Sequence, residues 1–571
     1  MFDMGFVNLL QNLTLIAGGG GAATAAIGLM ATLMFCFFSY CILYQSRRNE
    51  RLPPGPYPWP IIGNLHQLRL PIHRTLRHLA NKYGPILFLR FGSVPTLVVS
   101  SSEMAKQFLK THDLIFASRP PTSVGKYFFY NFKDIAFAPY GDHWRKMRKI
   151  CVLELLTAQR IESFKHVRQE EVSAMIRSIW EESESGRFAV NVTEAIYASL
   201  ANILWRILAR KKFSDNDLGT DGKGFTDLVR EVSTAVGSLN IGDFVPYLDW
   251  LDLQGIKRSL KKANRRFDAF AEKIINDHVD HHMARASNGQ EETMPHVKDF
   301  VDVLLEVAET NTTDTKLKRE TIKALIFVCL SDFTHCHPIP ILKLERFEQP
   351  NILLTVFVFL QQLFAAGMET SADALEWAMS ELLRHPHAIH RLQEEIESVV
   401  GQHGKVNESN LASMVYLQCV VKETLRLYPS LPLAIPHASV EAVTVGGYYI
   451  PKKTMVIMNL WAIGRDPDVW GADASEFNPE RFLRVEEHGM DLSGGQSDFR
   501  MLPFGAGRRR CPGSAMAILT VEYALAQLLH TFDWRVEGDP SELDMKEACA
   551  TTMPRQAPLF AYPSLRRPRR L

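Results

Sequence analysis

Apolar residues recur along most of this chain with the three- and four-residue spacing of an α-helix. This pattern predicts helices over much of Ser101–Leu427 and over Ser514–Leu529. Two β-rich runs, Ile86–Phe91 and Thr96–Ser100, are separated by a short turn containing Gly and Pro and predict a hairpin. Val443–Ile450, with two adjacent glycines at its centre, predicts another. We therefore expect a mainly α fold with small β sheets.

The N-terminus has a different pattern. Residues 4–46 include no charged residue, and residues 22–44 within them are mostly apolar and long enough to span a bilayer. Three arginines follow between residues 47 and 51, so the positive-inside rule places the bulk of the chain in the cytosol. A cleaved signal peptide would need a basic start, which this sequence lacks. We expect a lumenal N-terminus at 1–21, a single-pass transmembrane anchor at 22–44, a basic and proline-rich hinge at 45–65, and a catalytic domain at 66–571.

The composition mainly argues against certain classes of protein. The chain is 46% hydrophobic and 22% charged with a formal net charge of +1, so a large core is possible and nothing favours nucleic acid as a partner. The eight cysteines are scattered without a CxxC pair, which fits reduced thiols facing the cytosol better than a disulfide framework.

One cysteine stands in an unusual setting. Residues 504–513 read FGAGRRRCPG, and the predicted helix Ser514–Leu529 follows directly. A thiolate at a helix N-terminus beside arginines is stabilised by backbone N–H groups and by those charges, which suits a metal ligand that must stay deprotonated. A lone cysteine is more often a small buried apolar residue, and only the surrounding pattern argues otherwise.

That pattern, FxxGxRxCxG, resembles the haem-ligand loop of the cytochrome P-450 superfamily. The resemblance implies haem b as cofactor, with Cys511 as the axial thiolate of the iron. It also implies that Arg509 pairs with a haem propionate and that Phe504 shields the sulfur. Gly507 and Gly513 would allow the backbone to approach the cofactor closely.

Further segments resemble the same superfamily. Trp144 and Arg148, one turn apart in a predicted helix, would reach the haem propionates, and His437 would donate to a propionate. A surface basic helix and a surface histidine are the alternatives. The segment before His437 would face substrate through Leu433, Ala434 and Ile435.

Glu423 and Arg426 form an ExxR pair, whose side chains meet on one face of a helix. Arg481 lies in FNPERF and resembles the PERF arginine of the superfamily. By resemblance, the three would form a buried network that fixes the chain beside the haem loop. We expect their role to be structural.

The segment Ala365–Ser371, AAGMETS, resembles the oxygen-activating signature of the superfamily's I helix. A mid-helix glycine costs about 1 kcal/mol relative to Ala, and the reason implied for Gly367 is a local widening of the helix where dioxygen binds. An acid beside an alcohol, Glu369 and Thr370, suits proton delivery during oxygen activation. Ala366 would line the substrate pocket.

Residues 328–361 interrupt this helix. Thr321–Phe327 resembles its start, and removing 328–361 joins it to QLFAAGMETSADALEW as one amphipathic helix, whereas three prolines inside the interruption would break it. Val328 has codons that begin with GT, and Leu360-Gln361 can be encoded by TTGCAG, as intron ends require. We interpret 328–361 as a translated, retained intron. A genuine loop insertion and a second membrane-contacting element remain alternatives.

The resemblance extends from about Leu52 to Pro563 and is strongest to plant microsomal A-type members. It implies a monooxygenase of the endoplasmic reticulum membrane that hydroxylates a small hydrophobic plant metabolite with O2. Phenolic or flavonoid-like substrates are favoured, and terpenoids come next. Electrons would come from NADPH through a separate reductase that docks around Arg508–Arg510. A haem-thiolate isomerase or dehydratase, and an inactive membrane protein disrupted by the insert, are the alternatives.

Overall fold

The computed structural model describes residues 51–210, 240–266, 298–303, 350–401, 404–484, 498–548 and 551–566, with a few isolated positions elsewhere. The predicted anchor at 22–44 lies outside these residues, apart from Gly28 and Thr32. Within the described part of the chain, no helix is both long enough and apolar enough to cross a membrane.

The described strands form three small sheets. The largest has the order β1-β2-β7-β4 and is built from β1 (Ile86–Phe91), β2 (Val94–Val99), β7 (Met455–Met458) and β4 (His437–Ala438). The second has the order β3-β9-β8 and consists of β3 (Val190–Asn191), β9 (Phe560–Leu565) and β8 (Phe532–Arg535). The third is the hairpin of β5 (Val443–Val445) and β6 (Tyr448–Ile450).

Helices make up most of the remaining described structure. The longer helices are α3 (Ile72–Tyr83), α7 (Asp142–Ile150), α9 (Lys165–Glu182), α10 (Val192–Ala209), α16 (Pro350–Arg384), α17 (Pro386–Val400), α18 (Val415–Leu427) and α22 (Ser514–Thr531). The short helices are α4 (Ser102–Lys106), α5 (Asp113–Phe116), α6 (Ser123–Tyr127), α8 (Ala158–Ser163), α12 (Ile241–Phe244), α19 (Leu460–Ile463) and α20 (Pro467–Trp470). Single turns are η2 (Leu65–Gln67), η3 (Gln107–Thr111), η4 (Cys151–Leu155), η6 (Pro246–Leu251), η8 (Glu408–Ser413), η9 (Pro479–Leu483), η10 (Gly507–Arg509) and η11 (Pro540–Glu542).

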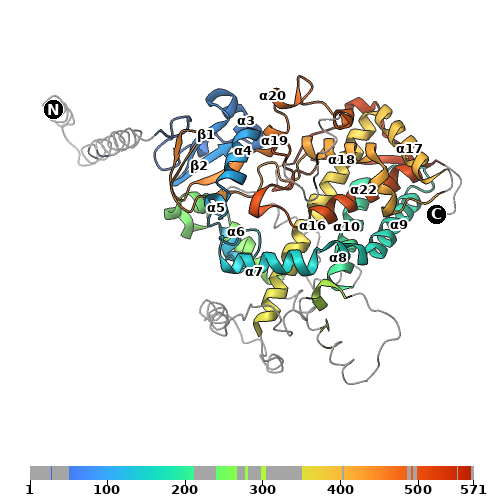
Figure 1. Ribbon diagram of the computed structural model, residues 1–571, viewed down its shortest axis with the longest axis horizontal. Coiled ribbons are helices and arrows are strands. Elements are labelled where there is room, and N and C mark those ends of the chain that lie inside the picture. Colours follow the sequence, from blue (N-terminus) through green and yellow to red (C-terminus); the bar gives the residue numbers. More distant parts are fainter. Residues whose placement is uncertain are drawn as a thin grey trace, which may run out of the picture.

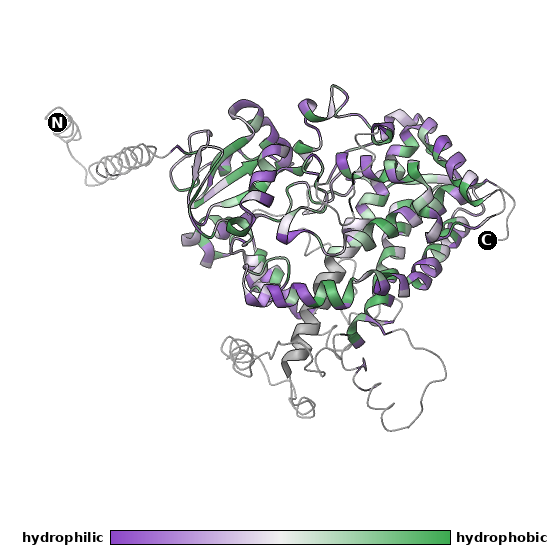
Figure 2. Cartoon of the chain, in the orientation of Figure 1, coloured by the Kyte–Doolittle hydropathy of each residue, from purple (hydrophilic) through white to green (hydrophobic). Residues whose placement is uncertain are grey.

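Helix α16 passes through the middle of the helical part, while β1 and β2 of the largest sheet lie beside α3 and α4 at one end of the described structure (Figure 1). Helices α10, α18 and α22 pack against α16, and their apolar residues share one core. Ile196, Leu375, Leu417 and Leu525 in that core are 0% exposed. The peripheral helices α9 and α17 show one hydrophilic and one hydrophobic face (Figure 2), as expected for helices that cover a core.

The predicted elements are largely confirmed. Val443–Ile450 forms β5 and β6 around Gly446 and Gly447, whose φ angles of 57° and 80° suit a tight hairpin turn. The first predicted hairpin differs in its turn: Val94 and Pro95 already pair with Phe91 and Arg90, so the turn is tighter than expected. The glycine at its start, Gly92, has a φ of 54° that permits this geometry.

Helix α16 also differs from its prediction. It begins at Pro350 and continues without interruption through Gly367–Ser371, so the last part of the predicted insert is helical. Proline is well placed at a helix start, because its missing N–H would have no helical partner there. Thr321–Phe327, the predicted start of this helix, lies outside the described residues.

Candidate active site

A tight loop presents Cys511 just before α22. The Cys511 N–H donates to the Phe504 carbonyl at 2.9 Å, and the Arg510 N–H donates to the Gly507 carbonyl at 3.2 Å. Gly507 has a φ of 66°, and a Cβ there would lie 2.3 Å from the Leu109 carbonyl oxygen. This position therefore requires glycine for packing within the protein. At Gly513 a Cβ would meet nothing within 4 Å, so there is open space beside the cysteine.

The Cys511 side chain is exposed, although the protein around it is dense. Burial raises the pKa of its thiol, and the Gly513 N–H and the charges of Arg148 and Arg510 offset this only in part. Because desolvation is the largest effect, the deprotonated Cys511 that the predicted ligand role requires needs stabilisation in addition to that from the loop. Coordination to a metal would supply the missing stabilisation, since a coordinating thiol is deprotonated outright.

Buried and half-buried guanidinium groups gather beside this loop. Arg509 donates to the carbonyls of Ala117 and Ala138, each at 2.6 Å, and stacks 4.4 Å from the ring of Trp144. Burial lowers the pKa of Arg509 to about 10 and that of Arg119 to about 9, and the two cations also oppose each other.

Arg148 belongs to the same region, and burial lowers its pKa as well. The charge of Asp134 favours the ionised forms of both Arg119 and Arg509. Three guanidiniums, one buried and two half-buried, lie near the carboxylates of Asp134 and Asp113 and leave positive charge in excess. This donor set, beside an exposed thiol and open space, fits a group that carries carboxylates, as the haem propionates do.

Two predicted propionate contacts have other partners. The Trp144 indole N–H donates to the Ile135 carbonyl at 3.0 Å, so this ring supports Arg509. His437 is buried, and its Nδ1 lies 2.8 Å from the Phe116 carbonyl, to which it must donate. Burial and Arg119 hold the pKa of His437 well below its usual range. The Nδ1–H of His437 is therefore occupied by Phe116, and donation from this ring to a propionate stays a prediction.

Arg119 was missed as a site residue in the sequence. Its Nη1 donates to the carbonyls of Ile435 and Pro436 at 2.6 and 3.0 Å, which connects the substrate-facing segment to the guanidinium cluster. Arg119 lies in the segment FASRP, and no pattern within that segment identifies its arginine as a site residue.

On α16, Thr370 Oγ1 donates to the Ala366 carbonyl at 2.6 Å, and Ser430 Oγ donates to the Thr370 carbonyl at 2.8 Å. A Cβ at Gly367 would meet Leu204 of α10 at 3.2 Å. The structure thus gives Gly367 a packing role between α10 and α16, and the helix is regular rather than widened here. Glu369 is buried and Ala366 is exposed.

The three predicted pocket residues between α18 and β4 have different surroundings. Leu433 packs against one sheet-side core cluster and Ala434, with a φ of 51°, against another. Ile435 is half-buried and belongs to neither cluster, which leaves it the best placed of the three to contact a ligand.

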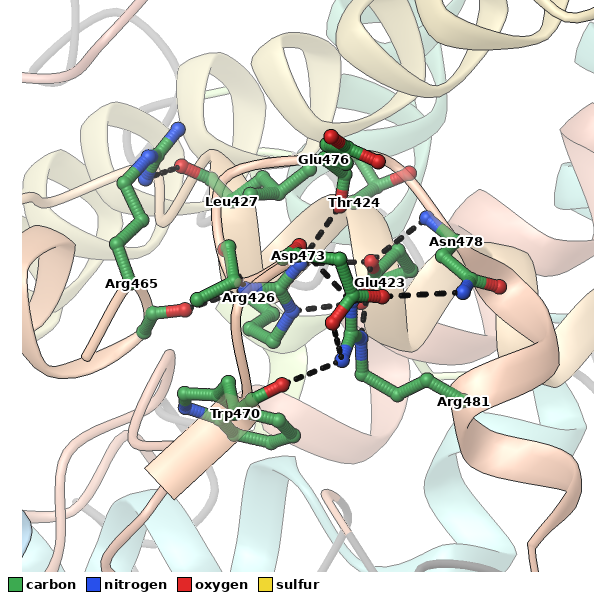
Figure 3. A network of polar contacts seen from close by, with 12 residues as sticks. Glu423, Thr424, Arg426, Leu427, Arg465, Trp470, Asp473, Glu476, Asn478 and Arg481 are labelled. Atoms are coloured by element: carbon green, nitrogen blue, oxygen red, sulfur yellow. Dashed lines mark hydrogen bonds and ion pairs between the residues drawn. The ribbon is translucent and has the colours of Figure 1, made fainter. Parts of the chain in front are cut away.

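Glu423, Arg426 and Arg481 form the predicted network (Figure 3). Arg426 Nε and Nη2 donate to the two carboxylate oxygens of Glu423 at 2.6 and 2.7 Å, and Arg481 Nε donates at 3.3 Å. The Asn478 N–H donates to Glu423 at 2.8 Å. Arg426 also binds the carbonyls of Gly464, Ala474 and Glu476. The network therefore ties α18 to the chain before η9.

The fold and the cysteine loop together define a haem-thiolate class of protein. Residues 53–332 and 343–559 match the family model described as cytochrome P450. The chain is 75% identical over 541 residues to cytochrome P450 750A1 of Pinus taeda, covering 95% of this chain and 96% of that protein. It is 39% identical over 552 residues to a flavonoid 3'-monooxygenase of Arabidopsis thaliana, covering 94% and 96%. A flavonoid 3'-monooxygenase of Crocosmia x crocosmiiflora is 38% identical over 542 residues, covering 94% and 97%.

The chain belongs to the cytochrome P450 family. It is a monooxygenase with a haem-thiolate centre, and electron supply from NADPH through a reductase is typical of that family.

Proposed function

We propose that this monooxygenase hydroxylates a small hydrophobic plant metabolite, with a phenolic or flavonoid-like compound first and a terpenoid next. The observation that carries this proposal is the similarity, along nearly the whole chain, to two flavonoid 3'-monooxygenases. The apolar character of Ile435 and Ala366 supports a hydrophobic substrate. The reaction is RH + O2 + two electrons + two protons giving ROH and water.

In this proposal Cys511 ligates the haem iron, and Arg119, Arg148 and Arg509 bind the propionates. The bound haem supplies the activation of dioxygen. Glu369 and Thr370 hold and move protons at the distal side, with Thr370 fixed through Ser430. Phe504 and the backbone of Gly507 and Gly513 shape the loop around the sulfur. The network of Glu423, Arg426 and Arg481 is structural.

An exposed apolar patch supports contact with a membrane. We define this membrane patch as Trp59, Ile61, Tyr247, Trp250 and Leu253, which are 57%, 73%, 77%, 78% and 62% exposed. Its two segments flank the β1–β2 turn, because the Gly92 N–H donates to the Ile62 carbonyl and the Ser93 N–H to the Phe244 carbonyl. Aromatic residues are favoured at membrane interfaces. The patch follows the predicted anchor at 22–44, and we place the protein on the endoplasmic reticulum with its catalytic domain in the cytosol.

The reductase would dock on the surface around Arg508 and Arg510. Arg508 is half-exposed and is paired with Asp113 at 3.1 Å. Acidic groups on the partner would be attracted to this surface, and the association would weaken at high salt.

Residues 328–361 remain, in this proposal, a retained intron. The family model match is interrupted only at 333–342, so it supports an insertion of that part of the segment, while 328–332 and 343–361 lie within the match. The chain lacking 328–361 would then be the competent enzyme, and the full chain would be an impaired product.

The test compares membranes that contain the full chain with membranes that contain the chain lacking 328–361, each with a plant reductase. Reduced, CO-bound difference spectra report thiolate ligation, and a panel of flavonoids, simple phenols and terpenoids reports turnover. NADPH-dependent hydroxylation confined to phenolic compounds would support the substrate class, whereas turnover of terpenoids alone would refute it. An equal thiolate band from both chains would show that 328–361 is a tolerated insertion. Cys511→Ser should abolish the band in either form.

A further inference from the structure

One face of α16 carries a row of buried acidic side chains that begins beside Thr370. Glu369, Asp373 and Glu376 are 9%, 0% and 1% exposed. Their spacing of four and three residues places them on one face of the helix, where neighbouring side chains meet. Acidic side chains are almost never buried this fully unless they are paired. The row therefore requires a physical explanation.

Asp373 is the most enclosed member. The Tyr197 hydroxyl on α10 donates to its Oδ1, and the Thr552 hydroxyl faces the same carboxyl group. Its Oδ2 is buried and makes no hydrogen bond within the described part of the chain. The charged groups acting most strongly on it, Glu369 and Glu376, are both acidic. An ionised carboxylate in such a place would be opposed by desolvation and by like charge, so the neutral acid is favoured.

Glu376 is the member of the row that lies next to Thr193. Thr193 Oγ1, at the start of α10, donates to Glu376 Oε1, and Arg555 lies 3.8 Å from the same oxygen. Thr193 is half-buried, so it lies closer to the surface than either acid. Burial raises the pKa of both Glu376 and Asp373, the latter well above its usual range. Asp373 and Glu376, two buried acids whose neutral forms are favoured by desolvation, thus lie between the half-buried Thr193 and Glu369.

We propose that Asp373 supplies protons to the monooxygenase reaction through Glu369. In this step the O–H bond of Asp373 breaks as an O–H bond forms on Glu369, which then serves Thr370. The Asp373 carboxylate regains a proton from Glu376, and Glu376 regains one from solvent at the Thr193 end. Each turnover consumes two protons. Protons already bound to buried acids can be delivered without first being transferred from solvent. The inference requires only the monooxygenase activity and not the proposed substrate class.

The test uses the haem-containing enzyme with Asp373→Asn, which keeps the shape of the side chain and a carbonyl acceptor for Tyr197 but removes the proton. Glu381→Gln is the matched control. Glu381 is also a buried α16 acid, 2% exposed, and accepts a hydrogen bond from the Tyr428 hydroxyl, but it lies farther along the helix from Thr370.

The first readout is independent of turnover. The infrared difference between wild type and Asp373→Asn near neutral pH should show the loss of a protonated carboxylic acid band. Loss of an ionised carboxylate band instead would overturn the proposal. If Asp373→Asn fails to retain haem, Tyr197→Phe takes its place. It should shift a carboxylic acid band, because it removes a hydrogen bond from that group, and an unchanged spectrum would count against the proposal.

The second readout is the product formed per NADPH consumed, measured with a compound from the panel that is turned over. Asp373→Asn should lower this ratio about tenfold and should raise the solvent deuterium isotope effect. Both effects should be smaller than those of replacing a group that transfers the proton directly to the reacting oxygen. The deficit should grow between about pH 6 and pH 8 as solvent protons become scarcer. Glu381→Gln should change none of these quantities. Equal behaviour of the two variants would overturn the proposal.

Discussion

Glu423→Gln is the substitution for which the structure allows the most direct estimate of cost. Glu423 is 0% exposed and accepts two hydrogen bonds from Arg426 and one each from Arg481 and the Asn478 N–H. Glutamine fills the same volume, but it replaces one acceptor oxygen by an NH2 group. That NH2 group would face the N–H donors of Arg426, and two buried guanidiniums would lose their shared counter-charge.

Removing one partner of a buried ion pair costs about 3–5 kcal/mol, because it leaves the other charge uncompensated. Arg481 keeps Asp473 as a partner at 2.9 Å, so Arg426 is the charge left uncompensated and we expect the middle of that range. A domain's whole stability is about 5–15 kcal/mol, and Glu423→Gln should therefore remove a large fraction of it. Urea unfolding of the haem-containing protein, followed by the CO-bound band and by tryptophan fluorescence, measures the loss. Trp470, 5.2 Å from Arg426, is one of the nine tryptophans that contribute to this fluorescence.

Glu162→Gln is the matched control for this measurement. Glu162 pairs with Lys165 at 3.0 Å with the same three-residue spacing, but the two side chains are 65% and 31% exposed. An exposed pair contributes about 0–1 kcal/mol. If Glu423→Gln lowered the unfolding free energy no more than Glu162→Gln, the reasoning that burial makes the network structural would be refuted.

Three further predictions concern the cysteine loop, the guanidinium cluster and the membrane patch. Gly507→Ala should abolish the thiolate CO band, because its Cβ would lie 2.3 Å from the backbone oxygen of Leu109 at a φ of 66°. Arg119→Gln should weaken haem retention about 10- to 100-fold, the equivalent of one charge-assisted hydrogen bond, as measured by haem transfer to apomyoglobin. Replacing Tyr247 and Trp250 by Asp in a chain without residues 1–50 should lower binding to phospholipid vesicles and leave the CO band intact; unchanged binding would contradict the membrane assignment.

The sequence allowed good prediction where one short pattern determined one local structure. The ExxR spacing on a helix required Glu423 and Arg426 to meet, and two adjacent glycines marked the hairpin of β5 and β6. The sequence did not reveal the contacts that tertiary structure brings to two of the predicted residues. The single N–H of His437 goes to Phe116, which is remote in sequence, and Gly367 is explained by Leu204 on another helix. No local pattern specifies such partners, because they are brought together only by packing.

Among the buried and half-buried charges of the described part of the chain, two kinds of arrangement occur. In the first kind the charges are internally balanced, as in the bidentate pair of Arg168 with Glu408 at 2.7 Å and in the network around Glu423. Such groups satisfy each other, so folding alone accounts for them. In the second kind like charges predominate: the guanidiniums of Arg119, Arg148 and Arg509 on one side, and the acids at 369, 373 and 376 on the other.

Burying like charges together does not stabilise the fold, since desolvation and mutual repulsion both disfavour the charged forms. The repulsion within each cluster is reduced in a different way. An anionic group neutralises the guanidiniums, and bound protons neutralise the acids. The first addition is what the haem carboxylates provide, and the second is what a reaction that consumes protons requires. On this reasoning, a variant that neutralises one acid should stabilise the fold as pH rises, because the acid's raised pKa makes the folded state retain a proton that the unfolded state releases. Asp373→Asn should therefore gain unfolding free energy relative to wild type from about pH 4 upward, and the opposite slope would show that Asp373 is ionised in the folded protein.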